Sequence, residues 1–284
     1  MNEAVRSFRV ATWLGWQIES NWTDPFLFLI YSIVKPVASV MILVVMYWVI
    51  ARTNTASPYF AYMYVGNTAY IYVGSILAGV SWAVIDDREH YQTLKYIYAS
   101  PISFYFYLLG RGMARFLTGT LSVVITMAFG LLVLRLSIDA AQIRWLYLAV
   151  SMTVGLTSMA FLGLLLGAAT LQMARHSWLV GDTVAGALYL FCGAIFPPDK
   201  LPAWLRPLSF ALPLTYWLES LRRAILGSDA STSISPSLSG ISDGQLLLIL
   251  VGVTLLTGFV SIYFFRWSEH RAREKGRIDM TTQY

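Results

Sequence analysis

The chain has 284 residues, of which 57% are apolar and only 12% are charged. A soluble domain carries about 25% charged residues, so this composition excludes a water-soluble globular protein. Aromatic residues make up 15% of the chain, which excludes a disordered protein. The single cysteine, Cys192, excludes an internal disulfide framework and a cysteine-based metal cluster. We therefore expect an all-α polytopic membrane protein.

Residues 1–25 predict an amphipathic helix that lies at the membrane surface. On a helical wheel, apolar residues such as Phe8 and Trp16 fall on one broad arc, and Arg6 and Arg9 fall on the other. Polar residues interrupt the apolar run, which excludes a signal peptide. The alternative is a cytoplasmic lead-in with scattered aromatic residues.

The remainder, residues 26–284, is expected to form a single transmembrane domain. A helix needs about 20 mostly apolar residues to cross a hydrocarbon core about 30 Å thick. Six stretches are candidate spans: residues 26–50, 59–85, 104–134, 145–171, 178–196 and 245–265. The fifth of these is the shortest.

Six spans place both termini on the same side of the membrane. Of the 20 Lys and Arg residues, 12 fall on the side of the termini and 7 on the opposite side. Cytoplasmic segments carry an excess of Lys and Arg. We therefore expect both termini in the cytoplasm and the chain in the inner (cell) membrane.

The segment 86–101, on the same side as the termini, predicts a short amphipathic helix across the mouth of the bundle. It opens with a charged cluster, places Leu94, Ile97 and Tyr98 at three- and four-residue spacing, and stops at Pro101. The alternative is an ordinary solvated loop.

The outer stretch after the fifth span predicts a re-entrant hairpin. Pro197 and Pro198 break the span, and three further prolines divide residues 201–226. A continuous lipid-facing span with these breaks would leave backbone groups unpaired in hydrocarbon, so two short re-entrant or interfacial helices fit better. Residues 228–244 are rich in Ser and Gly and predict a flexible loop.

Polar residues within the spans are candidates for the substrate pathway. Lys35 either faces the pathway, pairs with a carboxylate such as Asp182, or reaches the cytoplasmic headgroups. Tyr70 and Tyr72 either line the pathway or pack in the core with a hydroxyl partner.

Two further features lie in the second half of the chain. Glu219 is spaced to pair with Arg222 or Arg223 in the outer hairpin, with a gating or substrate-contacting role as the alternative. The Gly163–Gly167 spacing predicts close helix packing, more readily within one chain than between two.

At the level of motifs, the chain resembles the permease subunit of type-2 ABC exporters, which move drugs, lipids or lipid-linked polysaccharides. The resemblance covers essentially the whole chain and rests on two stretches. The first is Asp87-Arg88-Glu89, Thr93-Leu94 and Ala99-Ser100-Pro101, where the commoner family form reads Gly-Thr-Leu-Glu and this chain has Gln92 and Lys95. The second runs from Phe196-Pro197 through Leu201-Pro202 to Leu221-Arg222.

The resemblance implies that the first stretch is a coupling helix that contacts an ATPase. Two copies of that ATPase would bind a dimer of permease chains, more readily a homodimer, in the lipid bilayer; no nucleic-acid partner is expected. ATP and Mg²⁺ would bind the ATPase, because this chain has no Gly-x4-Gly-Lys-Ser/Thr run. The candidate coupling residues are Asp86, Asp87, Arg88, Glu89, Thr93, Leu94, Ala99, Ser100 and Pro101.

The alternative is a stand-alone six-span membrane protein without an ATPase partner. A membrane enzyme would cluster acid–base groups or metal ligands at one face, but all three histidines (His90, His176 and His270) fall in predicted cytoplasmic segments. A secondary transporter would repeat a broken helix in each half, and the one clear break lies late in the chain. We expect no catalytic residue and no metal site.

Overall fold

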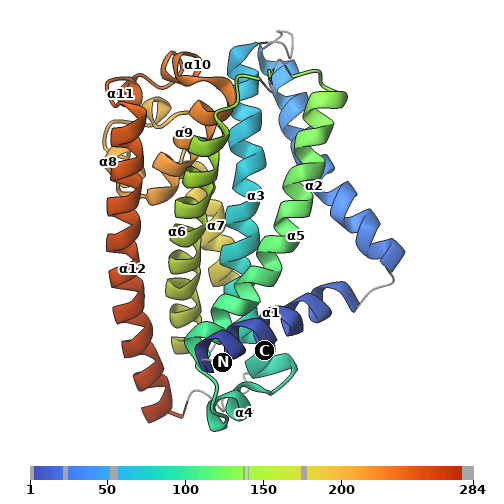
Figure 1. Cartoon of the computed structure of the whole chain (residues 1–284), viewed down its shortest axis with the longest axis vertical. Coiled ribbons are helices and arrows are strands. Elements are labelled where there is room, and N and C mark those ends of the chain that lie inside the picture. Colours follow the sequence, from blue (N-terminus) through green and yellow to red (C-terminus); the bar gives the residue numbers. More distant parts are fainter. Residues whose placement is uncertain are drawn as a thin grey trace.

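This computed structural model describes residues 3–21, 25–51, 57–136, 138–139, 141–173 and 178–276, and most of these residues are helical. Long helices run side by side as a bundle, and short helices gather at its two ends (Figure 1). No strand occurs among the described residues. The predicted all-α class is confirmed.

Five helices are long and apolar enough to cross a membrane. Each covers one of the stretches predicted from sequence, and the last extends well beyond its predicted end. Helix α2 continues through Pro36 without a break. The five are α2 (Pro25–Ala51), α3 (Pro58–Ile85), α5 (Phe104–Leu132), α6 (Trp145–Gln172) and α12 (Asp243–Glu274).

The stretch predicted as the fifth span forms a shorter helix, α7 (Trp178–Phe191). Its 14 residues reach about 21 Å at 1.5 Å per residue, less than the thickness of a hydrocarbon core. Gly193 adopts a φ of +79° soon after the helix ends, and this left-handed backbone turns the chain toward Pro197 and Pro198. The described residues therefore contain five full-length spans and one short apolar helix.

Helix α3 is the centre of the bundle. Within its span 72% of the residues are buried, compared with 33% or less in each of the other four. Glycines let its neighbours approach closely: a Cβ at Gly112 of α5 or at Gly163 of α6 would lie 3.0 Å or 3.1 Å from the Val80 side chain. Gly167 faces the same residue, so the predicted glycine spacing serves packing within the chain.

Helix α1 (Glu3–Asn21) crosses the lower part of α5 rather than running along the bundle (Figure 1). Gly110 of α5 accommodates the crossing, because a Cβ there would lie 2.5 Å from the Phe8 carbonyl oxygen. Farther along, Arg115 forms an ion pair with Glu19 at 2.6 Å. Burial raises the pKa of the Glu19 carboxyl, and Arg115 opposes this effect. The predicted amphipathic helix is present.

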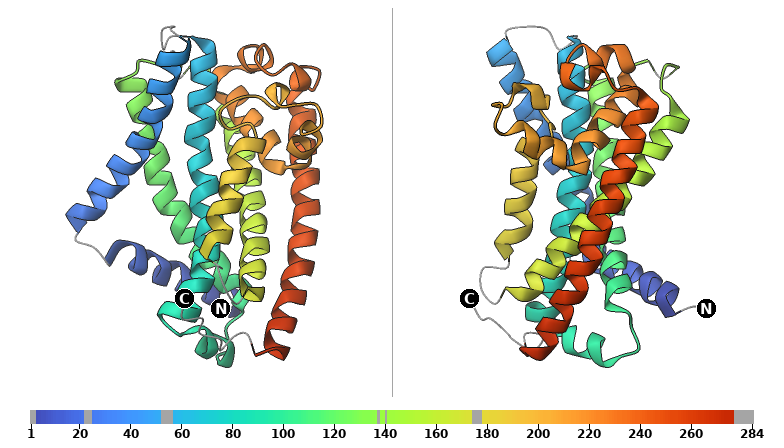
Figure 2. Two further views of the ribbon diagram at one scale, coloured as in Figure 1. Left: turned by 180° about the vertical axis from the view of Figure 1, so that it is seen from behind. Right: turned by 90° about the vertical axis from the view of Figure 1, so that its left-hand side faces the viewer.

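At the opposite end, short helices form a packed cap (Figure 2). Two of them, α8 and α9, fall in the stretch predicted as a pair of short helices. The flexible loop predicted for residues 228–244 is wrong, because Ser231 and Ser235 are buried and Asp199 accepts a hydrogen bond from the Ser235 hydroxyl at 3.2 Å. The cap comprises η2 (Pro198–Lys200), α8 (Arg206–Ala211), α9 (Pro213–Leu226), α10 (Ser228–Thr232) and α11 (Pro236–Ser239).

The contact between α6 and α9 gives a first prediction. A Cβ at Gly155 would lie 1.9 Å from the Trp217 ring, so Gly155→Leu should destabilise the fold by about 1–3 kcal/mol through overpacking. Thermal unfolding of the purified chain in detergent measures the loss. The control is Gly252→Leu, since nothing lies within 4 Å of a Cβ at that position; an equal loss of stability in both variants would contradict this packing.

Candidate functional site

Two clusters of buried charge lie at opposite ends of the bundle. The first, called here the α4-end cluster, consists of Asp86, Asp87, Arg88, Tyr107 and Arg111. The second, called the α9 cluster, consists of Glu219, Arg222, Arg223 and Asp243 with their backbone partners. Both contain residues that the sequence singled out.

Asp87 is the centre of the α4-end cluster. Helix α3 continues as a π-helical turn, η1 (Asp86–His90), which buries the Asp87 side chain to 1% exposure. Its carboxylate accepts hydrogen bonds from Tyr107 at 2.8 Å and from Arg111 at 3.2 Å. Both partners lie one turn apart on α5, so this ion pair joins the end of α3 to the start of α5.

Arg88, the next residue, binds a different helix. Its guanidinium donates to the carbonyl oxygens of Thr170 at 3.4 Å and Met173 at 3.0 Å, at the end of α6. The last carbonyls of a helix have no partner within the helix, and a cation there also complements the helix dipole. Arg88 further pairs with Glu89 at 2.7 Å. Because Asp87 binds α5 and Arg88 binds the end of α6, two adjacent residues attach α3 to both helices.

The segment 86–101 is not the single helix predicted from its sequence. Gln92 adopts a φ of +52°, and this conformation interrupts the helix between the π-turn and α4 (Leu94–Ala99). Leu94 and Ile97 are buried, as their spacing predicted. A residue in the left-handed region cannot continue a right-handed helix, which explains why two pieces form.

The exposed face of this segment differs from the predicted set of contact residues. Asp87, Arg88 and Leu94 are buried within the chain, whereas Tyr91 is 52% and Tyr96 66% exposed. The sequence carries no local signal that marks these two tyrosines as exposed.

The other predicted coupling residues lie nearer the surface. Asp86 pairs with His90 at 2.8 Å, and Ser100 donates to the Ile97 carbonyl oxygen at 2.8 Å. Ala99 and Pro101 are exposed. Glu89 and Thr93 are partly exposed.

In the α9 cluster, Arg222 is enclosed by backbone oxygens. Its guanidinium lies 3.7 Å from the centre of the Tyr62 ring and donates to the Tyr62 carbonyl at 3.1 Å. It also donates to the carbonyls of Gly193 at 2.7 Å and Ala194 at 2.8 Å. Arg222 therefore holds the chain that follows α7 against α3, and it does not pair with Glu219.

Arg223 is the partner of Glu219, at 3.1 Å. It also donates to the Leu238 carbonyl at 2.6 Å and to Asp243 at 3.1 Å. Burial lowers the pKa of Arg223, but hydrogen bonds to Asp243 and Glu219 outweigh that effect and raise it. The predicted ion pair is confirmed for the i+4 arginine. The other contacts of Arg223 tie α9 to the rest of the cap and to the start of α12.

The remaining pathway candidates divide into buried and exposed residues. Tyr70 is buried, donates to the Ala185 carbonyl and packs against Tyr189. Tyr72 is buried and its ring stacks on Phe116 at 5.5 Å. Both tyrosines therefore occupy the core, the second of the two roles considered for them.

Lys35 and Asp182 are exposed on the outer faces of α2 and α7. The described residues contain no ion pair between them.

The sequence profile of the ABC-2 type transporter family matches residues 6–226 of this chain. This match runs from α1 to the end of α9. It includes the α4-end cluster and Glu219, Arg222 and Arg223 of the α9 cluster, but not Asp243. The chain belongs to the ABC-2 type transporter family. Comparison with curated proteins finds no significant match. By its family and its apolar helices, the chain is a multi-pass membrane permease. It is the transport component of an ABC system rather than a catalytic one.

The break at Gln92 acquires a meaning within the ABC-2 family. The commoner family motif has Gly where this chain has Gln92, and the backbone there has the positive φ that glycine adopts without strain. Gln92 therefore holds, in this permease, a backbone conformation that glycine would adopt with less strain. Among the described residues, no three His, Cys, Asp or Glu side chains are grouped as metal ligands.

The α4-end cluster gives a second prediction. Asp87→Ala should destabilise the permease by about 3–5 kcal/mol, because it leaves Arg111 buried without its main carboxylate. Thermal unfolding in detergent measures this. The matched control is the double variant Asp87→Leu with Arg111→Met, which removes both charges and should recover most of the loss; a double variant as unstable as the single one would contradict the pairing.

The α9 cluster gives a third prediction. Glu219→Ala removes the acceptor for Arg223 and for the Ser231 hydroxyl, which donates to it at 2.8 Å. We expect a loss of about 3 kcal/mol, seen as earlier protease cleavage within residues 228–242. Asp229→Ala, on the exposed surface of α10, should leave the cleavage rate unchanged.

Proposed function

We propose that this chain is the permease subunit of an ATP-driven exporter, energised by a separate ATPase that docks on the segment 86–101. Two permease chains, as a homodimer, would bind two ATPase subunits, which carry ATP and Mg²⁺. The substrate is an amphipathic or lipid-linked molecule, taken from the cytoplasm or the inner leaflet. Membership of the ABC-2 family supports the transport role.

The observation that carries the proposal is the attachment of one surface segment to three spans. Asp87 binds α5 and Arg88 binds the end of α6, while both residues continue α3. A displacement of the π-turn therefore moves the ends of all three helices. This is the connection that an ATPase needs in order to act on a membrane bundle.

The docking surface of this proposal is the exposed side of the same segment. Tyr91, Lys95, Tyr96 and Pro101 are all exposed there. Aromatic residues with a flanking cation are typical of binding hot spots. The buried Asp87 and Arg88 of the π-turn act within the chain, whereas the tyrosines supply the contact.

Charge distribution supports a cytoplasmic location for this surface. Helix α1, α4 and the last turns of α12 lie at one end of the bundle (Figure 1), and the C-terminal part of α12 is rich in arginine. By the excess of Lys and Arg on the cytoplasmic side, this end faces the cytoplasm. Transport toward the cap is then export across the inner membrane.

The pathway is assigned to the space between two permease chains. Within one chain Tyr70, Tyr72, Glu219 and Arg222 are enclosed, so they shape the walls rather than contact a substrate. Lys35 is the exposed candidate on a spanning helix. We expect it to face either the second chain or the headgroups.

The fourth prediction tests the docking surface. Tyr96→Glu should reduce ATP-driven transport at least about tenfold, because a charged residue replaces an aromatic contact at the interface. Co-purification in mild detergent of a subunit with a nucleotide-binding Gly-x4-Gly-Lys-Ser/Thr motif should fall in parallel. The control is Glu274→Ala, also exposed at this end but outside the segment.

Two results would overturn this function. The first is a chain that purifies alone and transports without an ATPase, which would favour a stand-alone membrane protein. The second is full transport by both the Tyr96→Glu variant and an Ile97→Pro variant, since proline at position 97 removes the Ile97 N–H that donates to the Thr93 carbonyl and would break α4.

A further inference from the structure

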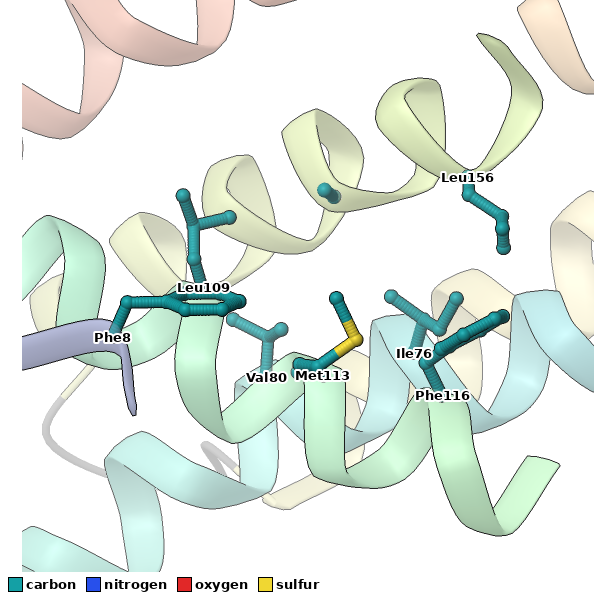
Figure 3. A pocket seen from close by; sticks show the side chains of 9 residues that line it. Phe8, Ile76, Val80, Leu109, Met113, Phe116 and Leu156 are labelled. Carbon is teal, nitrogen blue, oxygen red and sulfur yellow. The ribbon is translucent and has the colours of Figure 1, made fainter. Parts of the chain in front are cut away.

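An apolar groove lies between α5 and α6, and residues of α3 form its base. Its volume is about 170 Å³, and its lining combines Phe8 of α1 with residues of the three spans. Figure 3 shows Leu109, Met113 and Phe116 of α5 and Leu156 of α6 pointing toward it, above Ile76 and Val80 of α3. Every lining side chain is hydrocarbon or thioether.

The groove follows from how the helices pack. Helices α5 and α6 each lie along α3 but contact each other far less. Gly112 brings α5 down onto Val80, and Gly163 does the same for α6. Gly112 lines the groove without a side chain of its own, and Phe8 of α1 lies at one end of the lining (Figure 3).

The groove belongs to the membrane-facing surface, because its walls are spans and Met113 in its lining is 37% exposed. An apolar cavity of about 150 Å³ holds a benzene molecule, so this space takes a short length of hydrocarbon chain. Lipid tails are as apolar as the lining. Hydrophobicity alone therefore gives no preference for a bound chain over the surrounding lipid, and a second contact must fix it there.

Helix α1 supplies that contact. Arg9 follows Phe8 directly and its side chain is exposed, whereas Arg6, two residues before Phe8, lies on nearly the opposite side of the helix. The helix crosses the lower ends of the spans (Figure 1), which is the level of headgroups in the proposed orientation. Basic residues beside a hydrocarbon groove on the cytoplasmic side bind anionic headgroups.

We propose that this groove binds one acyl chain of an anionic phospholipid, with the phosphate at Arg9. The site is distinct from the proposed docking surface and from the proposed pathway between chains. The bound lipid would join α1 to α5 and α6, so that it supports the helix that crosses them. The orientation is the only part of the proposed function on which this inference rests.

Native mass spectrometry of the purified chain tests the site, with phosphatidylglycerol and phosphatidylcholine as probes in separate titrations. We expect tighter retention of phosphatidylglycerol. Ala160→Phe, which fills the groove, should reduce its retention about tenfold. Val124→Phe, on an exposed part of α5 outside the groove, is the matched control and should change nothing. Arg9→Gln should reduce the preference for phosphatidylglycerol about fivefold, whereas Arg6→Gln, on the other side of α1, should leave it unchanged.

A phospholipid with a photoreactive acyl chain tests the groove without any variant. In the wild-type chain we expect the label on peptides that contain Phe8, Met113 or Leu156. Labelling confined to other faces of the bundle would overturn the site, and so would unchanged retention in Ala160→Phe. Equal retention of both lipids, or recovery of a free fatty acid instead of a phospholipid, would overturn the headgroup assignment. No ATPase takes part in these measurements, so their failure is distinguishable from a failure of the proposed function.

Discussion

Close packing around one central helix is the constraint on which this bundle depends. Helix α3 contacts α5, α6 and α7 along its length, and glycines on those partners face its side chains. Packing replaces the hydrophobic effect as the force between helices in a membrane, because lipid and protein are equally apolar there. Helices α5, α6 and α7 are therefore positioned by how closely they approach α3, whereas α1 packs against α5 and α12 against α6. Both polar clusters lie at the ends of α3.

The two clusters solve the same physical problem in different ways. A buried charge needs a partner and further hydrogen bonds to offset its desolvation. Asp87 obtains these from two side chains of one helix, whereas Arg222 obtains them almost entirely from backbone carbonyls. The first arrangement joins helices that could move together, and the second fixes an irregular stretch of chain that has no helical hydrogen bonds of its own.

Sequence alone predicted the helices that are long and periodic, since length and hydropathy follow directly from the thickness of the bilayer. It also predicted the Glu219–Arg223 pair, which depends only on spacing within one helix. It failed where the outcome depends on contacts between distant segments. The serines after residue 228 are typical of a loop, but Asp199 and Glu219 supply partners that order them. Likewise nothing local indicates that Asp87 faces inward and Tyr96 outward.

The attachment of neighbouring residues to different helices also limits how α3 can move. Asp87 binds α5 and Arg88 binds the end of α6, so the end of α3 is restrained in two different directions. Rotation of α3 about its own axis would pull against both at once. Tilting keeps both intact if the three helices turn together. A load applied at the π-turn would thus be converted into a shared tilt of a three-helix unit, with little torsion reaching the membrane interior.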